Sequence, residues 1–215
     1  MTVVKSGYDR KEHDLYETEE WATEALLRNI SVGDQVVWEP SAGNGKISRV
    51  LEKNGVAMVW SSDIKQYEYP VDIFDFLNTP TINEEVKKEL SSNVVCMDDP
   101  NPEIDNTAMG LVRSPQNPDW IITNPPYGKG NRDAVKYAEL ALKRADNVAL
   151  LLTAKFDFGK TRQHLFKNNP RFLMKIALLD RIQWFEGGTT GTEDHAWYVW
   201  GKRNLNTPVM RWEGK

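Results

Sequence analysis

The 215-residue chain is poor in the residues that build disulfide frameworks and metal centres. Its single cysteine, Cys96, excludes an internal disulfide and is compatible with a reducing cytoplasm. The three histidines, His13, His164 and His195, lack the spacing of zinc ligands, so we expect no metal. No apolar run approaches membrane-spanning length, and the N-terminus lacks the apolar core of a signal peptide. These absences favour one soluble, cytoplasmic domain over residues 1–215, with no membrane partner.

The net charge of −4 hides an uneven distribution of charge along the chain. Residues 1–128 carry 11 Lys and Arg against 22 Asp and Glu, whereas residues 129–181 carry 12 against 5. The basic segment interleaves cations with phenylalanines: Lys155, Phe156, Phe158, Lys160, Arg162, Phe166, Lys167, Arg171, Phe172, Lys175 and Arg181. Such a segment can follow a phosphate backbone and stack bases. The alternative is that the phenylalanines belong to the core and the charges lie on a solvated face.

Apolar strand patterns alternate with helical patterns along most of the chain. We expect strands at 34–39, 56–61, 119–123, 147–153, 171–179 and 195–201, and helices at 46–54, 132–144 and 160–167. Strands separated by helices predict an α/β fold with a mainly parallel central sheet that helices cover on both faces.

Residues 78–118 break this alternation. The segment is mostly acidic, contains five prolines and shows only a short helical pattern near 83–90. A segment of this length with weak periodicity is typical of a functional loop or lid. We therefore expect an ordered or partly ordered insertion beside the site.

The strand at 119–123 ends in the tetrapeptide Asn124, Pro125, Pro126 and Tyr127. The two prolines fix φ and force the backbone off the strand in an extended path. The Asn124 amide oxygen and the Pro125 carbonyl can then face one point, where an amino group would donate both hydrogens and direct its lone pair toward an electrophile. Tyr127 supplies a flat ring that can stack on a planar base or amide. The alternative is a polar turn after a buried strand.

A glycine-containing turn follows the first expected strand and precedes a helix. It comprises Glu39, Pro40, Ser41, Ala42, Gly43, Asn44 and Gly45. Glycines permit tight turning and close approach of a ligand to the strand end. Ser48 occupies the third glycine position of the dinucleotide fingerprint, and the turn has no phosphate-loop lysine. The turn therefore predicts a site for a nucleoside without a pyrophosphate.

Two acidic residues follow at later positions that suit the rest of a nucleoside. Asp63, at the end of the second strand, could accept hydrogen bonds from both ribose hydroxyls. Asp75 could accept from an adenine amino group, with Phe76 against the ring. The alternative for each acid is a helix cap or a solvated turn residue.

On these residues the chain resembles the S-adenosylmethionine-dependent amino-methyltransferases with an Asn-Pro-Pro-Tyr motif. It is most similar to the short phage-type adenine-N6 DNA methyltransferases. The matching motifs are residues 16–21, 39–45, 72–77, 124–127, 181–185 and 195–200. The resemblance implies a Rossmann-like class I methyltransferase domain, the cofactor S-adenosylmethionine, a DNA partner, and a bacterial or phage-infected host cell.

The resemblance also implies roles for individual residues. Asn124, Pro125, Pro126 and Tyr127 would be catalytic, acting on a flipped-out adenine by in-line attack. The implied cofactor-binding residues are Tyr16, Thr18, Glu39, Pro40, Ala42, Gly43, Gly45, Asp63, Ile64, Asp75 and Phe76. The implied substrate-binding residues are Trp184, Phe185, Lys155, Lys160 and Arg162, with Trp184 or Phe185 covering the base opposite Tyr127.

Three departures from the family pattern bear on this interpretation. Glu19 replaces the usual proline of the first motif, and Lys155 stands where we expect an arginine. We also expect no separate target-recognition domain. Sequence choice would then come from 78–118, from the loop at 187–194, from a specificity partner or from self-association.

Other functions stay open at the level of sequence. The same tetrapeptide occurs in enzymes that methylate RNA adenine or a protein glutamine. Enzymes that methylate cytosine N4 more often begin the tetrapeptide with serine, so Asn124 favours adenine without excluding cytosine. A non-catalytic, DNA-mimicking subunit would suit the acidic first 128 residues. The intact tetrapeptide and glycine turn argue against such a subunit, since it needs neither.

Overall fold

The computed structural model describes residues 16–78, 117–167, 169–184, 191–202 and 207–215. The expected helix near 83–90, most of the insertion at 78–118, and Phe185 lie outside these described residues. The strands are β1 Val36–Glu39, β2 Met58–Asp63, β3 Asp72–Ile73, β4 Trp120–Thr123, β5 Asn147–Thr153, β6 Phe172–Leu178, β7 His195–Trp200 and β8 Val209–Glu213. The helices are α1 Glu20–Leu27, α2 Lys46–Lys53, α5 Arg132–Arg144 and α6 Gln163–Phe166, with short 3-10 turns η1 Lys129–Asn131, η2 Phe156–Phe158 and η3 Lys160–Arg162.

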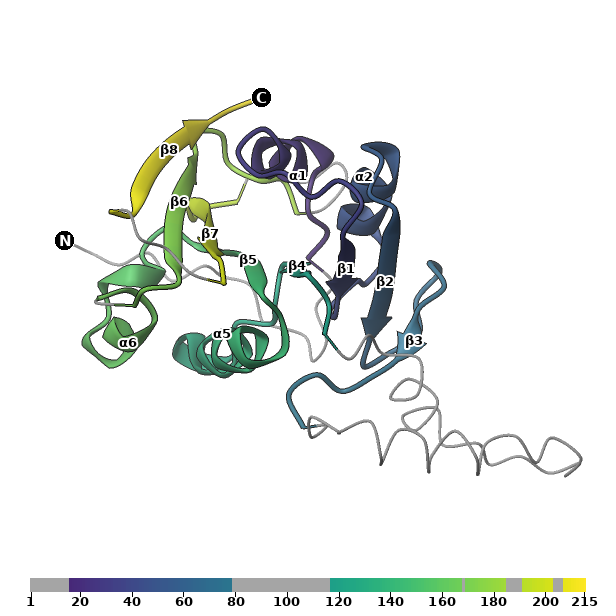
Figure 1. Ribbon diagram of the computed structural model, residues 1–215, viewed down its shortest axis with the longest axis horizontal. Coiled ribbons are helices and arrows are strands. Elements are labelled where there is room, and N and C mark those ends of the chain that lie inside the picture. Colours follow the sequence, from purple (N-terminus) through teal and green to yellow (C-terminus); the bar gives the residue numbers. More distant parts are fainter. Residues whose placement is uncertain (1–15, 79–116, 168, 185–190, 203–206) are drawn as a thin grey trace, which may run out of the picture.

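The eight strands form one sheet in the order β3-β2-β1-β4-β5-β7-β6-β8 (Figure 1). Strands β1 to β5 pair in parallel, β7 runs antiparallel between β5 and β6, and β8 pairs in parallel with β6. The expected mainly parallel sheet is therefore confirmed. The sequence did not predict α1, β3 or β8, and the helix expected at 160–167 is a 3-10 turn followed by one short helical turn.

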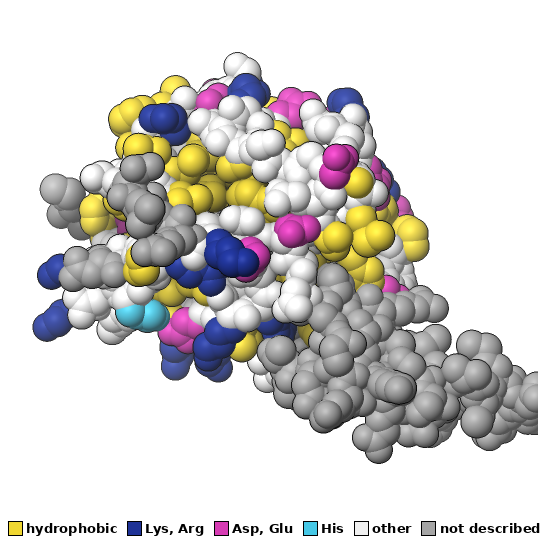
Figure 2. All heavy atoms as spheres, viewed as in Figure 1, with side chains coloured by type: hydrophobic (Ala, Val, Ile, Leu, Met, Phe, Trp, Pro, Cys, Tyr) yellow, Lys and Arg dark blue, Asp and Glu magenta, His cyan; other side chains and the backbone are white. Residues whose placement is uncertain are grey.

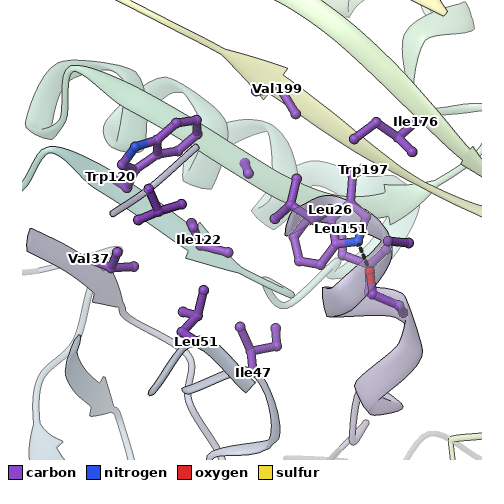
Figure 3. Packing of buried hydrophobic residues seen from close by; sticks show 14 of the residues in the cluster. Leu26, Val37, Ile47, Leu51, Trp120, Ile122, Leu151, Ile176, Trp197 and Val199 are labelled. Atoms are coloured by element: carbon purple, nitrogen blue, oxygen red, sulfur yellow. Dashed lines mark hydrogen bonds between the residues drawn. The ribbon is translucent and has the colours of Figure 1, made fainter. Parts of the chain in front are cut away.

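Helices cover both faces of the sheet. On one face, Leu26 of α1 and Leu51 of α2 pack with Ile122 and Trp197, whose indole nitrogen donates to the Ala22 carbonyl at 2.6 Å (Figure 3). Helix α5 packs against the other face through buried residues at positions 134, 137, 138 and 141, the spacing of an amphipathic helix. Strand β5 is buried on both sides for this reason, which explains its continuous apolar sequence.

The sheet brings several chain segments to one edge. Because β1, β2, β4 and β5 are parallel, their last residues Glu39, Asp63, Thr123 and Thr153 lie at the same edge. Antiparallel β7 begins there, with His195 opposite Thr153. This is the edge where open α/β sheets bind ligands.

Among the described residues, no helix has both the length and the apolar character needed to cross a bilayer.

Candidate active site

The side chain of Asn124 is held at the end of β4 by the segment that precedes α1. Its amide nitrogen donates to the Thr18 hydroxyl at 3.3 Å and makes a longer contact of 3.5 Å with the Tyr16 carbonyl. Thr18 is 2% exposed, so its position is fixed by packing. Since the amide nitrogen is engaged here, the amide oxygen points away from Thr18 as an acceptor. The arrangement suits recognition of an amino group.

The glycine turn lies beside this tetrapeptide, because β1 and β4 are neighbours paired at Trp38 and Ile121. Gly43 and Gly45 have φ values of 51° and 70°, which favour glycine. A Cβ atom at Gly45 would also lie 2.5 Å from the ring of Tyr69. The backbone of this turn therefore requires glycine at position 45 for two independent reasons.

Asp63 ties the glycine turn to the end of β2. Its carboxylate accepts hydrogen bonds from the Gly43 backbone at 2.9 Å and from the Lys65 backbone at 3.4 Å. A carboxylate at the carboxyl end of a parallel strand is a suitable acceptor for ribose hydroxyls. The next residue, Ile64, is 52% exposed and gives an apolar surface at the same strand end. The residues present thus fit a nucleoside.

Glu39 is buried at 1% exposure at the end of β1. It accepts a hydrogen bond from the Ser48 hydroxyl, which lies 2.6 Å from the Ser61 hydroxyl. Burial raises the pKa of Glu39 to about 8. Ser48, at the third glycine position of the dinucleotide fingerprint, thus holds the buried acid from α2.

Asp75 and Phe76 differ from the other expected cofactor residues. Asp75 accepts from two backbone N–H groups just after it and from the Asn78 side chain at 2.8 Å, so it closes its own turn. Phe76 is 2% exposed, lies 4.2 Å from the Tyr137 ring and has the Arg144 guanidinium over its other surface. In this structure the ring of Phe76 belongs to the core and offers little surface to a ligand.

Four aromatic rings form a wall next to Asn124. Tyr127 donates to the Leu151 carbonyl at 3.2 Å, and its ring lies nearly parallel to His195 with centroids 6.3 Å apart. Trp184 meets His195 edge-on at 4.9 Å and Tyr16 at 5.7 Å. The structure therefore brings the two expected aromatic residues, Tyr127 and Trp184, to the same wall. The sequence analysis did not identify His195 as a site residue.

His195 is buried and stays neutral in the wall. Burial lowers its pKa to about 4, and its Nδ1 donates to the Glu193 carbonyl at 3.1 Å. The sequence signal for the place of His195 in the aromatic wall was that a histidine begins an aromatic-rich strand.

The basic segment divides into cations that stabilise the fold and cations that face solvent. Arg171 donates to the carbonyls of Leu142, Ala145, Asp146 and Gly201, and so ties the loop after α5 to the start of β6. These hydrogen bonds use the guanidinium for structure, and they leave it unsuited to a phosphate backbone.

Lys175 is likewise committed to the fold. It is 9% exposed and donates to the Ala154 carbonyl at 2.7 Å and to both oxygens of Asp157 at 3.0 Å. Phe156, Phe166 and Phe172 pack in the core. The alternative of core phenylalanines therefore holds for Phe156, Phe166 and Phe172, whereas Phe158 is exposed.

The remaining cations stay candidates for a substrate contact. Lys155 and Lys160 are exposed, and the Arg162 guanidinium lies 4.8 Å from the centroid of Phe156. Phe158 is 79% exposed. Lys and Arg side chains also gather over α5 and α6 on the face seen in Figure 2.

Within the described part of the chain, no three His, Cys, Asp or Glu side chains are grouped as metal ligands.

Comparison with known proteins gives similarity in structure but none in sequence. No family model matches the chain. No curated protein matches it either.

Several solved structures are similar to this chain. A provisionally assigned RNA methyltransferase from Pyrococcus horikoshii has a TM-score of 0.59 at 14% identity, over 93% of this chain and 94% of that chain. The modification subunit of a provisionally assigned type I restriction enzyme from Vibrio vulnificus YJ016 has a TM-score of 0.54 at 12% identity, over 92% of this chain and 46% of that chain. A provisionally assigned hemolysin from Lactococcus lactis reaches 0.52 at 10% identity, over 90% and 91%.

Identities this low establish a shared fold and leave activity undetermined, as the variety of these assignments illustrates. Together with the sheet order, the similarity shows that the chain has the Rossmann-like class I methyltransferase fold.

Proposed function

We propose that this chain is an S-adenosylmethionine-dependent methyltransferase that methylates the N6 amino group of adenine in DNA. The observation that carries the proposal is the position of Asn124, held by Thr18 at 3.3 Å beside the glycine turn. An amino-group acceptor and a nucleoside-binding turn at neighbouring strand ends suit transfer between a cofactor and an exocyclic amine.

The residues that would hold S-adenosylmethionine lie along the carboxyl ends of β1 and β2. Gly43 and Gly45 provide the turn, Asp63 provides acceptors for the ribose, and Ile64 provides an apolar surface. Tyr16 and Thr18 border the same region from the chain before α1, as the contacts to Asn124 indicate. When bound, the cofactor supplies an electrophilic methyl group on its sulfonium.

The tetrapeptide orients the amine that receives this methyl group. The Asn124 amide oxygen and the Pro125 carbonyl accept the two amine hydrogens, which turns the nitrogen lone pair outward. Rate enhancement then comes mainly from alignment and from acceptors that stabilise positive charge growing on nitrogen.

The aromatic wall suits a planar base outside the helical stack. In duplex DNA the adenine amine lies within the stack, so the base has to be flipped out before transfer. By this proposal Tyr127 and Trp184 cover the extruded base, and their common contact with His195 supports that role. Lys155 and Lys160 are exposed and available for phosphates.

RNA adenine is the second candidate acceptor. The structural neighbour with a TM-score of 0.59, over nearly the full length of both chains, is provisionally assigned to RNA methylation. The modification subunit of a restriction enzyme supports DNA, although this chain spans less than half of that subunit. A partner subunit for sequence choice is compatible with that second similarity.

The test is a direct product analysis. The purified protein is incubated with S-adenosylmethionine and either unmethylated double-stranded DNA or total RNA, and the digested nucleosides are quantified by mass spectrometry. N6-methyladenine in the DNA is the expected result. N4-methylcytosine in DNA, or methylated adenine in RNA alone, would overturn the base or substrate assignment. The absence of any methylated nucleoside in both would overturn methylation of nucleic acid.

A further inference from the structure

The outer edge of the sheet at β6 and β8 carries several exposed hydrophobic side chains. Phe158 is 79% exposed, Leu179 68%, Trp212 62% and Met210 39%. Solvated positions on an ordinary monomer seldom gather this many large apolar side chains, and such a patch marks an interaction site.

The strand register places the principal members of this patch on one face of the sheet. Met210 pairs with Lys175, and Trp212 pairs with Ala177 two residues later, so both point to the same side. The Lys175 ammonium lies 5.5 Å from the centroid of the Phe158 ring. Phe158, Met210 and Trp212 therefore share one face, at the end of the sheet where β8 lies in Figure 1.

This face meets the aromatic wall at the edge of the sheet where β5 ends and β7 begins. Lys175 donates to the Ala154 carbonyl, and the Ala154 backbone N–H donates to the Asp194 carbonyl at 2.8 Å. Asp194 directly precedes His195, which contacts Tyr127. A polymer whose target base lies at Tyr127 reaches this face by crossing that edge of the sheet, because the paired residues Ala196, Ala177 and Trp212 lie on the face opposite to His195.

The charges around the patch decide between partners. Lys155 and Lys160 flank Phe158 in sequence, and both are exposed. Lysine is depleted in protein–protein interfaces, whereas exposed flat rings with cations beside them are typical of grooves for single-stranded nucleic acid. The chemistry therefore favours unpaired nucleotides over a protein surface.

We propose that Phe158 and Trp212 are stacking positions for unpaired DNA bases beside the flipped target base. Lys155 and Lys160 neutralise the adjoining phosphates. This inference rests on the proposed function and assigns part of the target contact to a sheet edge of this domain.

The test measures, by anisotropy at fixed salt, the affinity of variants of the 215-residue chain for a fluorescent DNA duplex with an unpaired stretch of several nucleotides around one adenine. We expect the double variant Phe158→Leu/Trp212→Leu to weaken binding by at least about 5-fold, which is the factor that corresponds to the lower end of roughly 1–3 kcal/mol for a single stacked base. Phe158→Tyr keeps the ring and should bind within about twofold of the wild type. Met58→Ser is the matched control, because Met58 is 58% exposed and lies at the start of β2, the end of that strand farther from the candidate active site.

Other results of this experiment would overturn either the stacking role or the proposed function. If the wild type methylates DNA and the double variant binds DNA with unchanged affinity, this inference is overturned and the proposed function stays intact. If the double variant fails to fold, Phe158→Leu alone is measured in its place. A shift in sedimentation with unchanged DNA affinity would assign the face to a second copy of the chain, and a larger loss on a matched RNA would overturn the assignment to DNA. A wild type that methylates no DNA overturns the proposed function itself.

Discussion

The turn after β1 and the segment after β5 both follow buried strands of one sheet, yet they use polar groups differently. In the turn, Asp63 fixes the Gly43 backbone, and positive φ values require glycine, so polar groups shape a surface for a ligand. In the segment after β5, Asp157 forms an ion pair with Lys175 of β6, so both charges are used within the fold. The comparison teaches that glycines required by positive φ identify a ligand site more securely than a run of lysines and arginines does.

The largest expected effect comes from the tetrapeptide that adjoins the turn. Asn124→Ala removes the acceptor for the amine and should lower the methyl-transfer rate by about 100- to 1000-fold, an effect typical of one oriented polar group. Cofactor affinity should change little, because the glycine turn keeps its own hydrogen bond from the Gly43 backbone to Asp63. Single-turnover kinetics and calorimetric titration measure the two quantities.

Asn54→Ala is the matched control for this variant. Asn54 is exposed and donates only to the Val50 carbonyl at the end of α2. Equal rates for the two alanine variants would remove Asn124 from catalysis.

The backbone requirement itself is tested at Gly45. Gly45→Ala combines φ of 70° with a Cβ 2.5 Å from Tyr69, so we expect a loss of about 2–4 kcal/mol in unfolding free energy. At Gly55, φ is 81° and nothing lies within 4 Å of the added Cβ, so Gly55→Ala should cost only about 1 kcal/mol. Urea unfolding of both variants gives the difference, and equal losses would show that the Tyr69 contact is irrelevant.

The structural use of the basic segment is tested at Arg171. Arg171→Met leaves four backbone carbonyls without their donor, and we expect a loss of about 2–3 kcal/mol in stability. Arg181 forms an exposed pair with Asp194, so Arg181→Met should cost no more than about 0.5 kcal/mol. A large loss of DNA affinity in Arg171→Met with unchanged stability would contradict the structural role.

The fold was largely predictable because its signals are local. The continuous apolar run of β5 and the amphipathic spacing of α5 reflect burial on two faces and on one face, respectively. Strand β8 was missed because its exposed sequence shows no burial pattern, and β3 because it has only two residues. Both strands are defined by pairing with a distant segment, which local patterns do not record.

The site was predictable only in part, for the same reason. Asn124, Gly43 and Asp63 follow strands, and strand ends meet at one edge of a parallel sheet. Whether Phe76 faces a ligand or the core depends on its packing with Tyr137, 61 positions away in the chain. Side-chain direction after a strand is set by such contacts, so the sequence left both possibilities open.

The buried acid beside the turn gives a prediction in pH. Folded Glu39 has a pKa of about 8, above its ordinary value, so the folded state binds a proton that the unfolded state has lost. Stability should therefore fall as pH rises from 6.5 to 8, by about 1–2 kcal/mol. His195 acts weakly in the opposite direction, because its lowered pKa of about 4 keeps it neutral when folded, whereas the unfolded imidazole is about half protonated at pH 6.5. It adds only about 0.4 kcal/mol of stability as the pH rises to 8.

Urea unfolding at pH 6.5 and pH 8 checks this linkage, with Glu39→Gln as the comparison. Glutamine keeps an acceptor for Ser48 but does not titrate, so the stability of the variant should not fall across the window and should rise slightly through His195. A wild-type protein as flat as the variant would show that Glu39 is ionised in the fold.

The smallest expected effect is on DNA affinity, and it distinguishes the exposed cations of the basic segment from those that are hydrogen-bonded within the fold. Lys160 is exposed and, by the proposed function, neutralises one phosphate, so Lys160→Ala should lower DNA affinity only a few-fold. The diagnostic quantity is the slope of log affinity against log salt, which should fall by about 1 because one counterion fewer is released. Lys143→Ala, at an exposed position in the last turn of α5, is the matched control and should leave the slope unchanged. Equal slopes for the wild type and both variants would show that Lys160, like Lys175, does not contact the nucleic acid.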